Sequence, residues 1–423
     1  MKVRDDFRGD RDPGAIPDFA IIGSGVSGGR MACELTAAGA RCLLLEAGSW
    51  FDASSDPGNE LDASARMYWG GGVELSADGA LGFLRGKCVG GGSVVNRAIL
   101  DRFDDDAWDD WRNRAGFPFL SGREMSTHYD AVEREGCPRD SKPGAPVTTL
   151  WRALEQGLRI WSEVEVRHLA FSRGLIRIFG TRGGVPTEVK AARVVLAAGA
   201  FGGAAILLRS GLGMRLPALG RGFTCHPRFF VYGLFDEPVD AHDGAFRAVR
   251  PDDAGFRRQG IRFETHFAPP IATAMLLPGL GRPHMGLMKG YRHLASMEVA
   301  VRDEPAGRLR LGHEGKLVID KPLTAADRRK ARTGVAVIRD RLSAAGARQI
   351  IACRQSLALH LMGGCALGND PARSVVGPDF RVHGCPNVYA ADSSIFPSAP
   401  GINPSLTIMA MSRKAARTIV GKE

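Results

Sequence analysis

The sequence predicts an α/β fold of two or three domains. Its 423 residues exceed the roughly 100–200 that one domain commonly contains. Residues 18–48 have the pattern of a βαβ unit: a short apolar strand, a glycine-rich turn, a helix and a second apolar strand. Residues 193–211 repeat the order of apolar strand, glycine turn and helix. Because strands that alternate with helices form parallel sheets, these segments indicate a Rossmann-like domain.

The composition excludes several classes of protein. Hydrophobic residues make up 44% and charged residues 24% of the chain, which is typical of a globular protein. No run of 18 apolar residues occurs, and the first nineteen residues lack the apolar stretch of a signal peptide. The eight cysteines form no CxxC pair and show no zinc-like spacing with histidine. We therefore expect a cytoplasmic protein with reduced thiols, no metal site and no transmembrane segment. The net charge of +10 is spread without a long basic run, so we expect no nucleic-acid partner.

The turn of the βαβ unit carries a dinucleotide-binding motif. Gly23, Gly25 and Gly28 form GxGxxG: the first allows the turn, the second admits a pyrophosphate, and the third lets the helix pack on the strand. Glu46 ends the second strand, where a carboxylate accepts hydrogen bonds from ribose hydroxyls. The motif alone does not distinguish FAD from NAD, since both contain the same ADP half.

Two further glycine-rich segments can approach a cofactor. Residues 84–99, LRGKCVGGGSVVNRAI, place successive backbone N–H groups in a loop that could cradle a phosphate or a flavin edge, or be simply flexible. Residues 193–211 bring backbone near a ligand after a buried strand, or serve only strand-to-helix packing.

Together with three later segments, these motifs resemble the glucose-methanol-choline (GMC) oxidoreductases, a family of FAD enzymes. The later segments are LGRGFTCHP (219–227), LALHLMGGCALG (357–368) and VYAADSSIFPSAPGINPSLTIMAMSRKAA (388–416). The resemblance spans nearly the whole chain and is closest to the branch of long-chain alcohol oxidases, cholesterol oxidases and bacterial sugar or polyol dehydrogenases.

The resemblance implies a discontinuous FAD-binding domain and a substrate-binding cap. Residues 17–100, 160–225 and 376–423 would form the first, and residues 101–159 and 226–375 the second, an antiparallel sheet with flanking helices. The alternating runs at 298–312 and 317–319 fit strands of this sheet. Residues 323–346 fit one or two amphipathic helices. The tryptophan-rich stretch 101–119 is expected to pack under the cap. The segment that joins the flavin loop to the VVLAAG strand is short for the family, so we expect a reduced cap.

The resemblance also assigns the cofactor contacts. FAD should be bound without a covalent link, because Val95 stands where some relatives carry a linking histidine. The expected contacts are Gly23, Ser24, Gly25, Val26, Gly28, Glu46, Ala47, Arg85, Gly91, Gly92, Asn96, Val166, Ala198, Gly199, Ala391, Asp392 and Pro404. Asp392 can equally serve as a helix cap.

Two residues are expected to perform the chemistry. Oxidising an alcohol removes its hydroxyl proton and passes a hydride to flavin N5, so a base or a hydrogen-bonding group must lie near the cofactor. His360, before MGGC, matches the catalytic histidine of the family. Asn403 matches its partner position, where an amide would orient the hydroxyl, although it can also cap a helix before Pro404.

Two positions depart from the family pattern. His226 follows Cys225 where an acid is usual, and we expect a structural role for this histidine. Arg97 follows the flavin-loop asparagine. It would stabilise negative charge on the reduced flavin or bind an anionic or polyhydroxylated substrate, or else turn outward to the acids at 101–110.

The resulting functional hypothesis is FAD-dependent oxidation of a small-molecule alcohol. The electron acceptor would be oxygen, a quinone or a redox partner protein. The alternatives are a redox-neutral or carbon–carbon reaction on the same scaffold, such as a lyase or a desaturation, and a non-catalytic flavoprotein subunit for electron relay. An NAD(P)-dependent enzyme is disfavoured by the C-terminal flavin segments.

Overall fold

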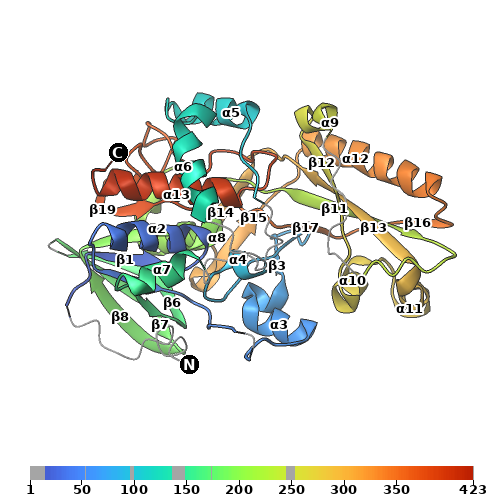
Figure 1. Ribbon diagram of the computed structural model, residues 1–423, viewed down its shortest axis with the longest axis horizontal. Helices are drawn as coiled ribbons and strands as arrows, with labels where there is room; N and C mark the ends of the chain where they lie inside the picture. The colour runs from blue at the N-terminus through green and yellow to red at the C-terminus, as the bar shows by residue number, and fades with distance from the viewer. Residues whose placement is uncertain are drawn as a thin grey trace.

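The computed structural model describes residues 15–52, 54–95, 100–135, 148–172, 174–243 and 253–422. Figure 1 shows two lobes along the longest axis of the molecule. One is built around the N-terminal strands and the last helix, and the other around long antiparallel strands with one long helix beside them.

The first lobe contains the predicted parallel sheet. Its six strands lie in the order β18(Arg381–Val382), β19(Cys385–Ala390), β9(Arg193–Leu196), β1(Phe19–Ile22), β2(Cys42–Leu45) and β5(Arg159–Trp161). Strand β1 pairs in parallel with β2 on one side and β9 on the other. The four residues of β1 and the four of β2 are buried, as expected of strands covered on both faces. The βαβ prediction is confirmed.

Helices pack around this sheet and complete its core. They are α2(Val26–Ala37), α5(Asp105–Ala115), α6(Gly122–Glu135), α7(Thr149–Glu155), α8(Gly199–Arg209) and α13(Ser405–Ile419). Trp108 and Trp111 of α5 are buried in this core, and the Trp111 ring lies 4.3 Å from that of Phe396, centroid to centroid. The family resemblance implies that residues 101–159 belong to the cap, but these tryptophans pack with the first lobe. The packing therefore favours a domain division that places α5, α6 and α7 with the parallel sheet.

The second lobe is built on a mainly antiparallel seven-stranded sheet. Its strands lie in the order β12(Ile261–Thr265), β13(Leu294–Val301), β11(Pro227–Leu234), β17(Ser356–Ala358), β4(Leu81–Phe83) and β3(Glu74–Leu75), and β16(Gln349–Ala352) also pairs with β11. The helix expected over 323–346 is a single one, α12(Ala325–Ala344), and Thr324 and Asp327 cap its N-terminus reciprocally. Apolar side chains of α12 and of one sheet face form a separate core.

Two smaller sheets and several short helices complete the fold. Strands β10(Arg221–Phe223), β14(Gly307–Leu311) and β15(Leu317–Asp320) form one sheet, and β6(Val164–Ser172), β7(Leu175–Arg182) and β8(Val185–Ala191) form the other. The short helices include α3(Glu60–Met67), α4(Gly92–Val95), α9(Ala254–Arg258), α10(Pro270–Leu276) and α11(Gly281–Lys289). In the described ranges, no helix is both long and apolar enough to span a membrane.

Candidate active site

The dinucleotide motif has the geometry that its three glycines predict. Gly23 has a φ of +100°, and a Cβ there would lie 2.4 Å from the Ala197 carbonyl oxygen. A Cβ on Gly28 would lie 1.9 Å from the Gly23 oxygen, so strand and helix can approach this closely only without a side chain. A Cβ on Gly25 would meet no atom within 4 Å. The motif thus has two glycines required by packing and one that leaves open space at the start of α2.

Glu46 is tied to the same loop. Its carboxylate accepts hydrogen bonds from the Ser24 backbone nitrogen at 2.9 Å, the Ser24 hydroxyl at 2.6 Å and the Gly48 nitrogen at 2.8 Å. Burial raises the pKa of this carboxyl, and the hydrogen bonds from Ser24 and Gly48 oppose the shift. Ala47 is the residue between these partners. The acid therefore stands at the end of β2, beside the glycine turn, as predicted.

The second glycine loop lies against the first. The Gly90 nitrogen donates to the Ser24 hydroxyl at 2.8 Å, and a Cβ on Gly91 would come within 3.1 Å of the Gly25 Cα. A Cβ on Gly92, which begins α4, would meet no atom within 4 Å. Two other residues predicted on this segment, Asn96 and Arg97, lie outside the described residues. The backbone of Gly90 and Gly91 therefore lies beside Ser24 and Gly25.

The C-terminal segment closes the same region. Asp392 accepts hydrogen bonds from the Gly199 nitrogen at 2.7 Å and from the Ser394 nitrogen at 2.8 Å, so it serves both the turn after β9 and a helix cap. The Ala391 carbonyl accepts from the Ser27 hydroxyl at 3.0 Å. The structure therefore brings together the predicted cofactor positions of four distant segments, near residues 23–28, 46, 90–92 and 391–392, together with Ala198 and Gly199.

The remaining predicted cofactor residues differ in their setting. Val26 is the first residue of α2, and Val166 lies in β6, two residues after Val164, whose nitrogen bonds to the Glu46 carbonyl. Pro404 precedes α13.

The Arg85 guanidinium is bound to Glu74 at 2.6 and 2.8 Å and lies over the rings of Trp69 and Phe201. The ion pair with Glu74 and the contacts with the two rings give Arg85 a structural role. This role is additional to the cofactor contact that the family resemblance implies.

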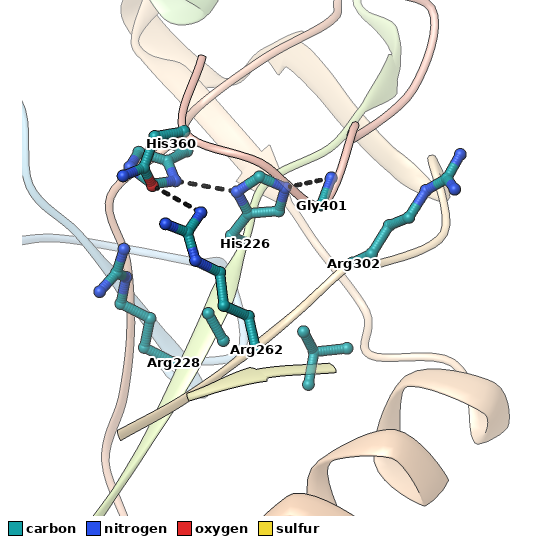
Figure 2. A pocket seen from close by; sticks show the side chains of 9 residues that line it. His226, Arg228, Arg262, Arg302, His360 and Gly401 are labelled. Carbon is teal, nitrogen blue, oxygen red and sulfur yellow. Dashed lines mark hydrogen bonds between the residues drawn. The ribbon is translucent and has the colours of Figure 1, made fainter. Parts of the chain in front are cut away.

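The two predicted catalytic residues line one pocket at the junction of the lobes. Its lining consists of His226, Arg228, Arg262, Ala300, Val301, Arg302, His360, Gly401 and Asn403. Figure 2 shows a ring nitrogen of His226 directed at a ring nitrogen of His360, with Gly401 on the far side of His226. The tertiary structure thus adds a second histidine and three arginines to the expected pair.

Hydrogen bonds define the protonation of the two histidines. The Gly401 nitrogen donates to Nε2 of His226 at 3.0 Å, so Nδ1 carries the proton of a neutral His226 ring. That proton points at Nδ1 of His360, 2.8 Å away. A neutral His360 in this arrangement therefore carries its own proton on Nε2. The structural role expected for His226 becomes specific: it contacts His360 directly.

The charges around His226 keep it neutral. Burial, followed by the positive charges of Arg228, Arg262 and Arg302, holds the pKa of His226 well below its usual value. Below pH 6.5 or so an unfolded chain takes up this proton, whereas the folded protein does not, so acid favours unfolding.

A neutral His226 predicts an acid-sensitive fold. Below about pH 6.5, each pH unit should cost the wild-type protein up to about 1.4 kcal/mol that a His226→Asn variant does not lose. The melting temperature measured from pH 5 to 7 should accordingly fall more steeply for wild type. His313→Asn is the control, since the side chain of His313 is 93% exposed. Parallel melting curves for wild type and His226→Asn would contradict the assignment.

A buried acid from elsewhere in the chain holds the segment that precedes His226. Asp303, after β13, accepts hydrogen bonds from the Cys225 nitrogen at 3.1 and 3.2 Å and from the Thr224 hydroxyl. Lys321 lies 2.7 Å from the same carboxylate, and both side chains are fully buried. This ion pair fixes the segment that carries His226.

Sequence reasoning missed Arg262, which contacts one of the predicted catalytic residues. Its Nη1 donates to Oδ1 of Asn403 at 3.2 Å, and its Nη2 lies 3.2 Å from Asp101. A charged residue in the strand sequence IRFET was the only signal available, and it says nothing about a partner 141 residues away. The hydrogen bond orients the Asn403 amide so that its NH₂ group is the donor left for a ligand.

The family comparisons agree with this geometry. The GMC oxidoreductase models match the chain at residues 64–135 and 126–228 for the N-terminal part and at 303–412 for the C-terminal part. An uncharacterized GMC-type oxidoreductase of Sinorhizobium fredii is 26% identical, over 94% of this chain and 94% of its own. That alignment extends over 488 positions, more than the 423 residues here, so the relative contains segments that this chain lacks.

Two other proteins extend the comparison. A long-chain-alcohol oxidase of Arabidopsis thaliana is 23% identical, over 92% of this chain and 65% of its own length. The solved structure of a formate oxidase variant of Aspergillus oryzae has a TM-score of 0.74 at 15% identity, covering 98% of this chain and 99% of that one. The latter similarity shows a shared fold.

Proposed function

Because the chain belongs to the GMC oxidoreductase family, whose members bind FAD, we propose that it oxidises the CH–OH group of a small-molecule alcohol. One observation carries the proposal: His360 and Asn403, from two segments of the C-terminal part, line the same pocket at the junction of the lobes. Among its relatives is a long-chain-alcohol oxidase, which acts on the same functional group.

The residues described around the glycine loops fit FAD. Gly25, Gly92 and Gly199 are positions where a side chain would meet no atom within 4 Å, so backbone can approach a ligand there. Glu46 stands where it can exchange its present hydrogen bonds for those of a ribose. When bound, FAD supplies the acceptor for the hydride of the alcohol carbon.

Asn403 would hold the alcohol oxygen. Since Oδ1 accepts from Arg262, the amide NH₂ group donates, and a donor aimed at the substrate oxygen fixes the direction of its C–H bond. The same donor stabilises negative charge that develops on the oxygen as the proton leaves.

His360 would accept the hydroxyl proton at Nε2. This requires the tautomer with its other proton on Nδ1, whereas the hydrogen bond from His226 favours the opposite one. Reaching it shifts both neutral rings to the other tautomer: His360 loses its Nε2 proton and gains one on Nδ1, and His226 loses its Nδ1 proton and gains one on Nε2, with equal numbers of protons exchanged with solvent. Nε2 of His226 then carries a proton facing the Gly401 N–H, which costs about 1–3 kcal/mol for the buried group left unsatisfied. We infer that the bond from the substrate hydroxyl to Nε2 of His360 offsets this cost.

Anaerobic titration of the FAD-loaded protein tests the proposal. An alcohol substrate should bleach the flavin absorbance band with one equivalent of substrate per FAD and yield the corresponding carbonyl compound. Consumption of substrate with the flavin band unchanged would instead indicate a redox-neutral reaction. A flavin reduced only by a protein partner, and by no alcohol in a panel of alkanols, sugars and sterols, would indicate an electron-relay subunit.

A further inference from the structure

The second lobe presents two different faces of its sheet. The face toward α12 is apolar. On the opposite face, Arg228 and Arg262 flank Ala300 in one row across β11, β13 and β12, and the next row brings Glu298 beside Glu264. Arg228 bonds to both glutamates, at 3.1 Å in the case of Glu264, and each of these three side chains is at least 95% buried. The sheet therefore forms a charged floor beneath the pocket.

The described residues that line the pocket are nearly all polar. Among them, Ala300 and Val301 contribute the aliphatic side chains, and the others are three arginines, two histidines, an asparagine and a glycine. The apolar part of the same sheet face, around Phe230 and Leu234, lies farther along and is covered by Phe267, Leu276 and Leu277. A hydrocarbon chain in the pocket would desolvate guanidinium groups without giving them hydrogen bonds.

The charges of the lining arginines are compensated. Arg228 pairs with Glu264 and Glu298, and Arg262 lies 3.2 Å from Asp101 and 3.3 Å from Glu264. Arg302 lies 2.9 Å from Asp110, and Figure 2 shows its guanidinium directed away from the two histidines. Each guanidinium has at least one carboxylate, so the pocket does not need an anion to balance its charge.

We propose that the substrate is a neutral polyhydroxylated alcohol, of the sugar or polyol type, and that Arg262 determines this specificity. The proposal rests on the proposed oxidation of an alcohol at His360 and Asn403. Arg262 is one hydrogen bond from the Asn403 amide, so a second hydroxyl beside the reacting one comes within reach of its planar group. A long-chain alcohol or a sterol offers no such second oxygen.

Matched substrates test the proposal with the FAD-loaded full chain. Anaerobic flavin reduction is measured with glucose, sorbitol, mannitol and myo-inositol, with 1-hexanol, 1-dodecanol and cholesterol, and with gluconate as the anionic counterpart. At least one neutral polyol should reduce the flavin with a second-order rate constant about 100-fold or more above that of 1-hexanol, equivalent to about 2.7 kcal/mol. Faster reduction by an alkanol, by cholesterol or by gluconate overturns the neutral-polyol assignment and leaves alcohol oxidation standing. No reduction by any of them contradicts alcohol oxidation itself.

Substitution of Arg262 tests the specificity residue. Arg262→Met should raise the apparent Kd of the best polyol at least about tenfold, about 1.4 kcal/mol, with a smaller change in the limiting rate of flavin reduction. Reduction by 1-hexanol should weaken less than reduction by the polyol, because the alkanol loses only the orientation of the Asn403 amide, whereas the polyol also loses its own bond to the guanidinium. Arg310→Met is the control, because Arg310 lies on β14 and pairs with Asp320 away from the pocket.

A second variant covers the case in which Arg262→Met fails to fold beside the buried Glu264. Arg262→Lys keeps the positive charge but loses the planar fork, and it should also raise the Kd for the polyol. An unchanged polyol Kd in a folded Arg262 variant overturns the role of this residue.

Discussion

Replacing His360 with alanine should slow reduction of the bound flavin by substrate about 10²–10⁴-fold, the usual loss when a general base is removed. His226 is the other histidine among the described residues that line the pocket, and both of its ring nitrogens already form hydrogen bonds, to His360 and to Gly401. It therefore cannot take over the role of the base. FAD content should stay at the wild-type level, since the residues expected to hold the ADP half, 23–28 and Glu46, are not among the described residues that line the pocket with His360. Stopped-flow absorbance under anaerobic conditions measures the rate directly.

Two companion variants separate the proton transfer from its surroundings. Asn403→Ala should cost less, about 1.5–3 kcal/mol for one hydrogen bond to a developing charge. His313→Ala should leave the rate unchanged, because that side chain is exposed. Flavin reduction at wild-type speed in His360→Ala would remove this residue from the mechanism.

The second large effect is expected at Gly25. A valine there should weaken FAD binding at least about 100-fold, or about 2.7 kcal/mol, because its side chain would fill the space through which a pyrophosphate approaches the start of α2. The purified variant should be colourless, and its Kd for FAD can be measured by quenching of flavin fluorescence on titration into apoprotein.

The chain offers a matched control for this substitution. Gly286, on α11, also has no atom within 4 Å of an added Cβ and is exposed, so Gly286→Val should bind FAD like the wild-type protein. The far-UV circular dichroism of the Gly25→Val apoprotein should match that of the wild-type apoprotein, since a Cβ at this position meets no atom within 4 Å. A yellow Gly25→Val protein with unchanged affinity would show that the cofactor does not pass this loop.

The histidine pair gives the two proposals a common physical basis. Its protonation depends on the Gly401 nitrogen and on three nearby arginines, and these same arginines make the pocket polar. The arginine charges that keep His226 neutral therefore also disfavour an apolar substrate in the pocket. In this respect we expect the chain to differ from its relative that is a long-chain-alcohol oxidase.

The sequence by itself determined the local elements and the motif that opens the chain. Apolar runs of four residues, a GxGxxG turn and an acid at the end of the second strand define a βαβ unit because their spacing follows strand and helix geometry, and the structure contains it at Phe19–Leu45. Periodicity likewise predicted one or two helices over 323–346, and the structure forms a single one, Ala325–Ala344. The choice of His360 and Asn403 came from family motifs, and their shared pocket supports it.

Only the tertiary structure decided which distant residues meet. His226 and His360 are 134 positions apart, and Arg262 and Asn403 are 141 apart, so no local pattern links them. The same holds for Asp303, which binds the Thr224–Cys225 segment before His226, and for α5, which packs on the first lobe. Periodicity encodes the face that a residue presents within its own element, whereas the partner on that face depends on the path of the whole chain.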